Sequence, residues 1–282
     1  MIGEREAAFL AAWDWSSCRR DRVATCLLCG SRGVPAAECD RYGFVNQWRA
    51  CAECELSWAE LRPTAEAYAE FYRTGAYRHL TRLWSTQVTD PMDAARWWLP
   101  QLTSAIGDAH GCRLLDVGGD DGLTAQLLAE HYACREAHCI DPAARQDEEI
   151  STTPGWRVKL HRSWGDFFLV EKSVLDTSSD PWLILCHQTI EHLHDPLTDL
   201  RQIASMMGPN SQLVMTVVDH AIVLNDTARR GHPRSRAFKI DHPYNYNRRS
   251  AGLLLDKAGF RVTSVSNIPP RFLLLNCELS DS

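Results

Sequence analysis

The chain has 282 residues, of which 45% are hydrophobic and 23% charged, and its formal net charge is −6. This length suffices for one large domain with a small appendage, and the negative charge argues against a broad surface for nucleic acid or an anionic membrane. No apolar run approaches the ~20 residues that span a bilayer. Residues 1–15 mix charged and apolar side chains, which predicts an amphipathic helix and not a signal peptide. We therefore expect a cytoplasmic protein.

Two Cys-x-x-Cys pairs stand out among the 11 cysteines. Cys26 and Cys29 form the first pair, Cys51 and Cys54 form the second, and residues 30–50 lie between them. This separation slightly exceeds the usual range of about 15–20 residues, which a longer hairpin can absorb. Four thiolates are the ligand set of tetrahedral zinc, and because they close the coordination shell we predict a structural metal. The alternative is four free or redox-paired thiols.

The pattern along the chain predicts three parts. Residues 1–62 form an N-terminal helix and the zinc-binding module. Residues 63–108 form a helical connection or lid, with helices over 64–84 and 90–106. Residues 109–282 form an α/β domain, because short apolar runs alternate with helical segments from Gly111 onwards.

The elements expected in the third part follow the order of a doubly wound sheet. Five strands are expected at 113–117, 137–140, 157–160, 182–186 and 213–218. Helices are expected at 123–132, 142–149, 196–207 and 249–258, and the runs 261–266 and 272–276 are expected to form an antiparallel pair. The predicted fold class is therefore α/β: a Rossmann-like, doubly wound, seven-stranded sheet with an antiparallel final strand pair, plus the small zinc module.

A glycine-rich turn joins the first strand to the first helix and reads Asp116-Val117-Gly118-Gly119-Asp120-Asp121-Gly122. Glycines in such a turn let backbone N–H groups and a helix N-terminus approach a ligand closely. A dinucleotide fingerprint, GxGxxG, would need glycine at position 120 or 121, and both are aspartate. These residues therefore do not match a nicotinamide-dinucleotide-binding turn.

This turn resembles motif I of class I S-adenosylmethionine (SAM)-dependent methyltransferases, an acidic residue followed by three glycines at alternate positions. Asp116, Gly118 and Gly122 match that pattern, whereas Asp120 replaces the middle glycine. Aspartate tolerates positive φ better than most residues, so the turn can survive the change.

Three later segments resemble the same family, in the same order along the chain. Ile140-Asp141-Pro142 resembles the end of the second strand, where the family binds ribose hydroxyls. The run Glu191 to Pro196, EHLHDP, is similar to the family's EHL-x-DP stretch, and Leu253 to Phe260 resembles its final helix, which closes on AGF.

The second cysteine pair carries a further resemblance. RACAECELSW at 49–58, followed by Phe71-Tyr72, is similar to zinc-bearing methyltransferases of natural-product and sugar biosynthesis, including sugar C-methylation. The resemblance implies SAM as cofactor and structural zinc on the four cysteines. It also implies a set of cofactor-binding residues: Asp116, Gly118, Gly119, Asp120, Gly122, Asp141, Pro142, Asp166, His187 and Gln188.

Candidate catalytic residues follow the ends of the fourth and fifth strands, where open α/β sheets bind ligands. His187 and His220 rank first as proton acceptors, because histidine is the natural base near neutral pH. A structural, hydrogen-bonded role remains open for each. Glu191 and His192 are candidates for a metal site or, as we favour, for packing at the start of a helix.

The segment 227–239 is rich in basic side chains and is expected to be a loop over the acceptor site. If so, it selects an anionic acceptor, such as a nucleotide-linked sugar or a phosphopantetheine-borne intermediate, because arginine forks match phosphate. A solvated loop is the alternative. The basic residues are Arg229, Arg230, His232, Arg234, Arg236 and Lys239.

The sequence thus predicts a SAM-dependent methyltransferase that acts on a small-molecule acceptor in biosynthesis, by O- or C-methylation. Two alternatives stay open: a nicotinamide- or nucleotide-dependent oxidoreductase, and a zinc-ribbon binding protein whose Rossmann-like domain holds cofactor without transfer. Arg19, Arg20 and Arg22 are the only support for nucleic acid as the ribbon's partner. The oligomeric state is left open.

Overall fold

The structure is a computed structural model, which describes residues 13–15, 17–74, 77, 90–143, 149–150, 158–164, 167 and 180–280. Three predictions fall wholly or largely elsewhere: the helix over 1–15, the second half of the helix over 64–84, and most of the helix over 142–149. Among the described residues, no helix is both long and apolar enough to cross a bilayer.

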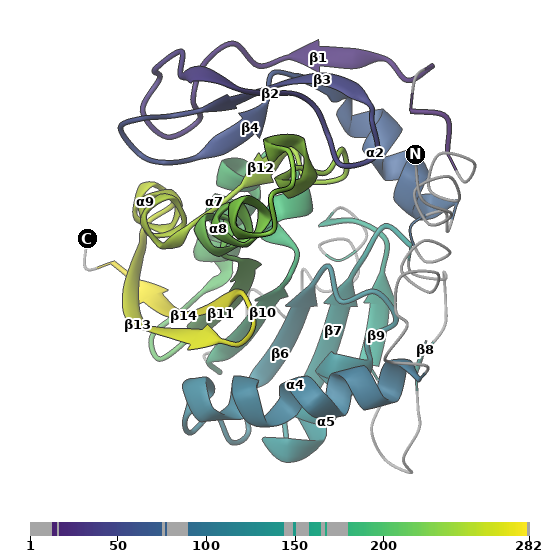
Figure 1. Cartoon of the computed structure of the whole chain (residues 1–282). Coiled ribbons are helices and arrows are strands. Elements are labelled where there is room, and N and C mark those ends of the chain that lie inside the picture. The colour runs from purple at the N-terminus through teal and green to yellow at the C-terminus, as the bar shows by residue number, and fades with distance from the viewer. Residues whose placement is uncertain are drawn as a thin grey trace.

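The centre of the molecule is a mixed sheet in the order β13-β14-β11-β10-β6-β7-β9-β8 (Figure 1). Its parallel strands are β6 (Arg113–Val117), β7 (Glu136–Ile140), β9 (Val158–His161), β10 (Trp182–His187) and β11 (Gln212–Val218). The final pair, β13 (Phe260–Ile268) and β14 (Phe272–Leu279), runs antiparallel. These seven strands confirm the predicted fold class, and the two-residue β8 (Glu149–Ile150) extends the edge beyond β9.

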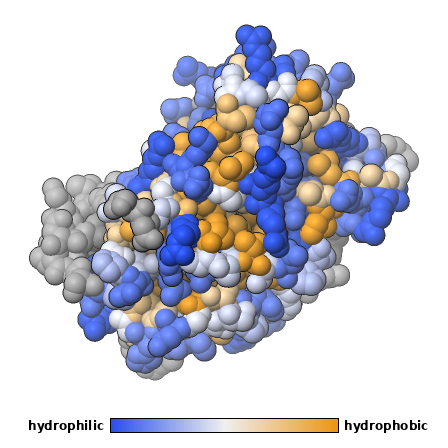
Figure 2. Space-filling model, turned by 90° about the vertical axis from the view of Figure 1, so that its left-hand side faces the viewer, coloured by the Kyte–Doolittle hydropathy of each residue, from blue (hydrophilic) through white to orange (hydrophobic). Residues whose placement is uncertain are grey.

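Both faces of this sheet are buried, because consecutive apolar side chains of a strand point to opposite faces. Leu114 packs with α4 (Pro91–Ile106) and α5 (Leu123–His131), whereas Leu115 packs with α7 (Pro196–Met206) and α9 (Arg248–Lys257). Figure 1 shows these two helical layers on opposite sides of the sheet. On the surface, apolar patches lie between charged side chains (Figure 2).

Two helices begin directly after residues whose side chains cap them. Asp90 accepts a hydrogen bond from Met92 N at 2.9 Å to begin α4, and Thr64 caps α2 (Ala65–Arg73). Both starts agree with the predicted ones.

One helix in the second half of the chain was missed. The segment 227–239 was predicted to be a loop, but α8 (His220–Arg229) occupies its start and a 3-10 turn, η2 (Arg234–Ala237), its middle. Asp219 caps α8 by accepting the N–H of Ala221 at 3.0 Å. The missed helix changes which basic side chains can face the site.

The N-terminal module lies beyond the carboxyl ends of the parallel strands (Figure 1). Its short outer pair is β1 (Arg20–Arg22) with β5 (Leu61–Pro63). Its main sheet contains β2 (Val34–Cys39), β3 (Val45–Ala50) and β4 (Ser57–Ala59), and β12 (Tyr244–Asn245) pairs with β4 to complete it. The module therefore shares a sheet with the α/β domain.

A second link between the two parts is made by Asp40, which is 2% exposed and lies in the turn after β2. Its Oδ1 accepts the N–H groups of Tyr42 at 2.9 Å and Phe44 at 3.0 Å. Its Oδ2 accepts the N–H of Ile240 at 2.8 Å. One carboxylate thus shapes the turn and holds the segment 237–246 against it.

We expect Asp40→Ala to lower the free energy of unfolding by about 2–4 kcal/mol, because it leaves three N–H donors without their partner. Chemical denaturation followed by fluorescence measures this change. Glu38→Ala, an exposed carboxylate two residues earlier in β2, is the matched control and should change stability by less than about 0.5 kcal/mol. Equal effects of the two substitutions would contradict the role of Asp40.

Candidate functional site

The site forms where the parallel strands end. The strand order reverses between β6 and β10, which are neighbours in the sheet although β7 and β9 come between them in the chain. Open α/β sheets bind their ligands in the crevice at this switch point. The glycine-rich turn follows β6 directly, so the structure places it at this crevice.

Two glycines in this turn are required by close packing. Gly118 has φ of 74°, and a Cβ there would lie 2.3 Å from Cγ2 of Thr189. A Cβ on Gly119 would lie 2.4 Å from Oδ2 of Asp116. The Thr189 hydroxyl also donates to the carbonyl of Val117 at 2.9 Å, which holds the segment after β10 against the turn.

Asp120, the departure from the family pattern, has φ of 52° and so adopts the left-handed conformation in which glycine is usual. Its N–H donates to Oδ2 of Asp141 at 3.0 Å, while Oδ1 of Asp141 accepts the N–H of Ala143 at 2.7 Å. The carboxylate at the end of β7 therefore holds the turn, and Asp120 takes the place of the middle glycine without breaking it.

Asp116 is fully buried at the end of β6, and neither of its carboxylate oxygens has a hydrogen-bond partner. Burial, and then the nearby charges of Asp141 and Asp121, raise the pKa of the Asp116 carboxyl to about 8. A buried acid of this kind is satisfied by a ligand that brings a positive charge. The ammonium group of SAM is such a charge, so the residues present fit this cofactor.

His187 is the last residue of β10 and Gln188 follows it, and both side chains contact neighbouring residues. Nδ1 of His187 lies 2.7 Å from Oγ1 of Thr216, and its Nε2 lies 3.3 Å from Nε2 of Gln188. The imidazole packs against Trp98, with ring centroids 4.5 Å apart. Burial lowers the pKa of His187 to about 4. Pro142 lies in the turn after β7, and Asp166 is outside the described residues.

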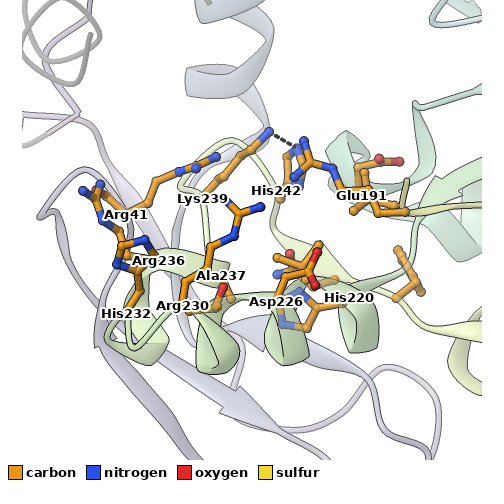
Figure 3. Close-up of a pocket in the computed structure, with 16 residues that line it drawn as sticks. Arg41, Glu191, His220, Asp226, Arg230, His232, Arg236, Ala237, Lys239 and His242 are labelled. Atoms are coloured by element: carbon orange, nitrogen blue, oxygen red, sulfur yellow. Dashed lines mark hydrogen bonds between the residues drawn. The ribbon is translucent and has the colours of Figure 1, made fainter. Parts of the chain in front are cut away.

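A cavity of about 370 Å³ lies beside the ends of β10 and β11 (Figure 3). His220, the first residue of α8, lines it together with Glu191. Two acidic side chains, Glu191 and Asp226, face a larger set of basic ones. The lysine and arginine residues in the lining are Arg41, Arg230, Arg236, Lys239 and Arg271.

Only part of the predicted basic segment faces this cavity. Arg230, His232, Arg236 and Lys239 line it. Arg229 instead pairs with Asp226 and leaves 79% of its side chain exposed. Arg234 is not among the lining residues either.

Arg41 and Arg271 also line the cavity, although the sequence did not predict them as site residues. Arg41 comes from the turn after β2 in the module and Arg271 from the turn between β13 and β14. No local pattern marks either residue, because only the packing of the module and the final hairpin brings them to the cavity.

The four predicted metal ligands converge in the module. Sγ of Cys26 lies 3.3 Å from Sγ of Cys54, Sγ of Cys29 lies 3.3 Å from Sγ of Cys51, and all four sulfurs lie within 4.8 Å of one another. A zinc ion with bonds of about 2.3 Å sets its thiolates about 3.8 Å apart. The cluster therefore fits a zinc module.

The two cysteine pairs have matching backbone turns. Gly30 follows the first pair with φ of 76° and donates its N–H to the carbonyl of Cys26 at 2.9 Å. Glu55 follows the second pair with φ of 63° and donates to the carbonyl of Cys51 at 3.0 Å. The second turn adopts this conformation without a glycine, as expected if a bound ion holds the turn.

A second group that could hold a metal consists of Glu191, His192 and His242, whose ligand atoms lie within 4.8 Å of one another. However, Nζ of Lys239 lies 3.3 Å from Nε2 of His242, which places a basic group where an ion would bind. Nδ1 of His192 lies 2.9 Å from both the Tyr72 hydroxyl and the carbonyl of Asp241. These contacts favour the packing role over a metal site.

The strand order, the glycine turn after β6 and the acidic residue after β7 define a class I SAM-dependent methyltransferase. A family model described as a methyltransferase domain matches residues 68–265. The chain belongs to this family and is a SAM-dependent methyltransferase. The nicotinamide-dependent oxidoreductase is thereby set aside.

Solved structures share the fold at low sequence identity. Magnesium protoporphyrin IX methyltransferase from Synechocystis PCC 6803, with bound SAH, is 12% identical with a TM-score of 0.51, and the match covers 77% of this chain and 100% of that one. Mitomycin 7-O-methyltransferase is 16% identical with a TM-score of 0.52, and the match covers 76% of this chain and 60% of that one. No curated protein sequence matches the chain significantly.

The cysteine cluster predicts that the protein binds zinc. We expect purified protein to hold about one zinc per chain, measured by inductively coupled plasma mass spectrometry. Cys54→Ser should lower the zinc content and the melting temperature together, because the metal ties the two turns of the module. Cys39→Ser, outside the cluster, is the control and should keep its zinc. Full zinc content in Cys54→Ser would contradict the assignment.

Replacing Asp116 by asparagine should raise the stability of the free enzyme and weaken cofactor binding. The pKa of Asp116 is higher in the folded enzyme than in the unfolded chain. Between about pH 4 and 8 the folded state therefore binds more protons than the unfolded state, so the free energy of unfolding falls as pH rises. Asp116→Asn removes this loss, so the variant should gain stability relative to the parent across that window, by a few kcal/mol at most. Each pKa unit corresponds to about 1.4 kcal/mol.

The same variant should bind S-adenosylhomocysteine (SAH) at least about 10-fold more weakly, because the partner of the ligand's ammonium is lost. Urea denaturation at several pH values and calorimetric titration with SAH measure the two effects. Asp256→Asn, on the exposed side of α9, should change neither. Unchanged SAH affinity in Asp116→Asn would show that the cofactor's charge lies elsewhere.

Proposed function

We propose that this methyltransferase transfers the SAM methyl group to a small anionic acceptor bound in the cavity beside β10 and β11. The observation that carries the proposal is the lining, in which five lysine and arginine residues outnumber two acidic ones. Arginine binds phosphate and carboxylate oxygens through paired N–H groups, so such a lining favours a phosphate-bearing acceptor. A nucleotide-linked or carrier-linked intermediate has this chemistry.

The cofactor's place is inferred from the residues around the glycine turn. Asp116 would face its ammonium group, Gly119 keeps the Asp116 carboxylate uncovered because it has no Cβ, and Asp141 follows β7, where the family binds ribose. SAM supplies a methyl group already activated by its sulfonium charge. The protein's task is therefore to align the acceptor and, where the acceptor is a hydroxyl or an acidic carbon, to accept its proton.

Glu191 is the best-placed proton acceptor among the described cavity residues. Burial raises the pKa of its carboxyl to about 7, which suits a base working near neutral pH. Burial lowers the pKa of His220 to about 3 and that of His187 to about 4, so both imidazoles are weak bases here. We therefore assign the proton-accepting role to Glu191, while His220 lines the acceptor cavity.

Two further features support the proposal. Two proteins of the same fold, magnesium protoporphyrin IX methyltransferase and mitomycin 7-O-methyltransferase, are named for small-molecule acceptors. The cysteine cluster lies in the module that supplies Arg41 to the cavity, so we propose that structural zinc holds this wall of the acceptor site. O- and C-methylation both fit this arrangement.

The anionic acceptor predicts how the basic residues affect phosphate binding. We expect Arg230→Ala to weaken binding of inorganic phosphate to the SAH-loaded protein by about 10-fold, since a hydrogen bond to a charged group contributes about 1.5–3 kcal/mol. Arg229→Ala is the matched control, because its side chain is exposed and does not line the cavity. Calorimetric titration with phosphate measures both variants.

Equal phosphate affinity in the parent and Arg230→Ala would contradict the proposed acceptor site. Transfer itself is tested by incubating SAM and the enzyme with a phosphate-ester fraction of small metabolites and measuring SAH. SAH formation that falls in Arg230→Ala but not in Arg229→Ala supports an enzyme with an anionic acceptor. Cofactor binding without SAH formation would favour the binding protein described above.

A further inference from the structure

Four side chains of the same cavity are buried and carry a polar atom without a hydrogen-bond partner. Glu191, His220, Asn245 and Tyr246 are at most 6% exposed, and all four line the cavity. The atoms without a partner are Oε2 of Glu191, Nε2 of His220, Nδ2 of Asn245 and the hydroxyl of Tyr246. Native proteins leave few such atoms, so four around one cavity indicate a polar ligand.

The chemistry of the four atoms defines what can satisfy them. The carboxylate of Glu191 accepts hydrogen bonds, the amide nitrogen of Asn245 donates them, and the hydroxyl of Tyr246 and the imidazole of His220 can do either. A hydroxyl group both donates and accepts, so a neutral group with several hydroxyls complements this mixture. An apolar ring would leave each atom unsatisfied, at a cost of about 1–3 kcal/mol each.

Two of these residues, Glu191 and His220, lie away from most of the basic ones labelled in Figure 3. In Figure 3, Arg41, Arg236 and His232 lie at one end of the cavity and Glu191 and His220 at the other, with Lys239 and His242 between them. The polar end is also held firmly, because the backbone N–H of His220 donates to the carbonyl of Tyr246 at 2.7 Å. The cavity therefore has a basic end and a polar end, where Asp226 also lies (Figure 3).

The polar end is the one that adjoins the cofactor turn. Glu191 comes two residues after Thr189, which packs against Gly118 and hydrogen-bonds to the carbonyl of Val117. A group held by Glu191 therefore lies on the side of the cavity from which the methyl group comes.

We propose that the acceptor is a hydroxyl-bearing phosphate ester, bound with its phosphate at the basic end and its hydroxyls against Glu191, His220, Asn245 and Tyr246. The hydroxyl-bearing part is then the part that is methylated. This inference rests on the proposed function and adds to it the orientation of the acceptor and the chemical class of its reacting end.

The test compares phosphate esters that differ in the group next to the phosphate. SAH-loaded protein is titrated in a calorimeter with inorganic phosphate, glycerol 3-phosphate, ribose 5-phosphate, glucose 6-phosphate and phenyl phosphate. We expect at least one hydroxyl-bearing ester to bind about 10-fold more tightly than phenyl phosphate. Glu191→Gln and Tyr246→Phe should each reduce this advantage at least threefold and leave the affinity for inorganic phosphate unchanged.

These titrations support or overturn the proposed orientation of the acceptor. Phenyl phosphate binding as tightly as the best hydroxyl-bearing ester would overturn it, as would an equal loss of affinity for both kinds of ester in the two variants. Glu191→Gln and Tyr246→Phe change few atoms, and a thermal melt confirms that each variant is folded. If SAH binds but neither phosphate nor any ester does, the anionic-acceptor proposal itself fails, which is distinguishable from failure at the polar end alone.

Discussion

The cavity beside β10 and β11 depends on the contact between the turn after β2 and the segment 237–246. The carboxylate of Asp40 makes this contact across 200 residues of sequence, by accepting the backbone N–H of Ile240. Further bonds reinforce it: Arg41 N donates to the carbonyl of Phe238 at 3.0 Å, and the Tyr68 hydroxyl donates to that of Ile240 at 2.6 Å. The segment held in this way supplies Lys239, His242, Asn245 and Tyr246 to the cavity. The module is thus one wall of the site.

The cysteine cluster packs against the same part of the module that contacts the segment 237–246. Cys26, Cys51 and Cys54 are part of the apolar core that continues through Trp58 and Tyr244 into the sheet. β4 of the module pairs with β12, and Ala59 N donates to the carbonyl of Pro243 at 3.0 Å. An ion at the cluster would therefore stabilise the acceptor side of the enzyme, whereas the glycine turn is held by Asp141 and Thr189 of the α/β domain.

In the proposed function, opposite charges divide the site between two ligands. The cofactor side presents a buried carboxyl, Asp116, without a partner, and the acceptor side presents mainly arginines. Burial disfavours the ionised form of Asp116, which a cationic ligand would restore. In this proposal Glu191 lies where the two sides meet, and burial raises the pKa of its carboxyl to about 7.

The sequence by itself determined the features that rest on neighbouring residues. The pairing of the cysteines by spacing, the Asp116-to-Gly122 turn, the order of strands and helices along the chain and the starts of α2 and α4 follow from local patterns, and the structure agrees with them. Only the tertiary structure decided that Arg41 and Arg271 reach the cavity, that Arg229 turns away, that α8 replaces a loop, and that β12 joins the module. These features depend on contacts between segments far apart in the chain, which no local pattern encodes, because a side chain's partner there is set by packing and not by spacing.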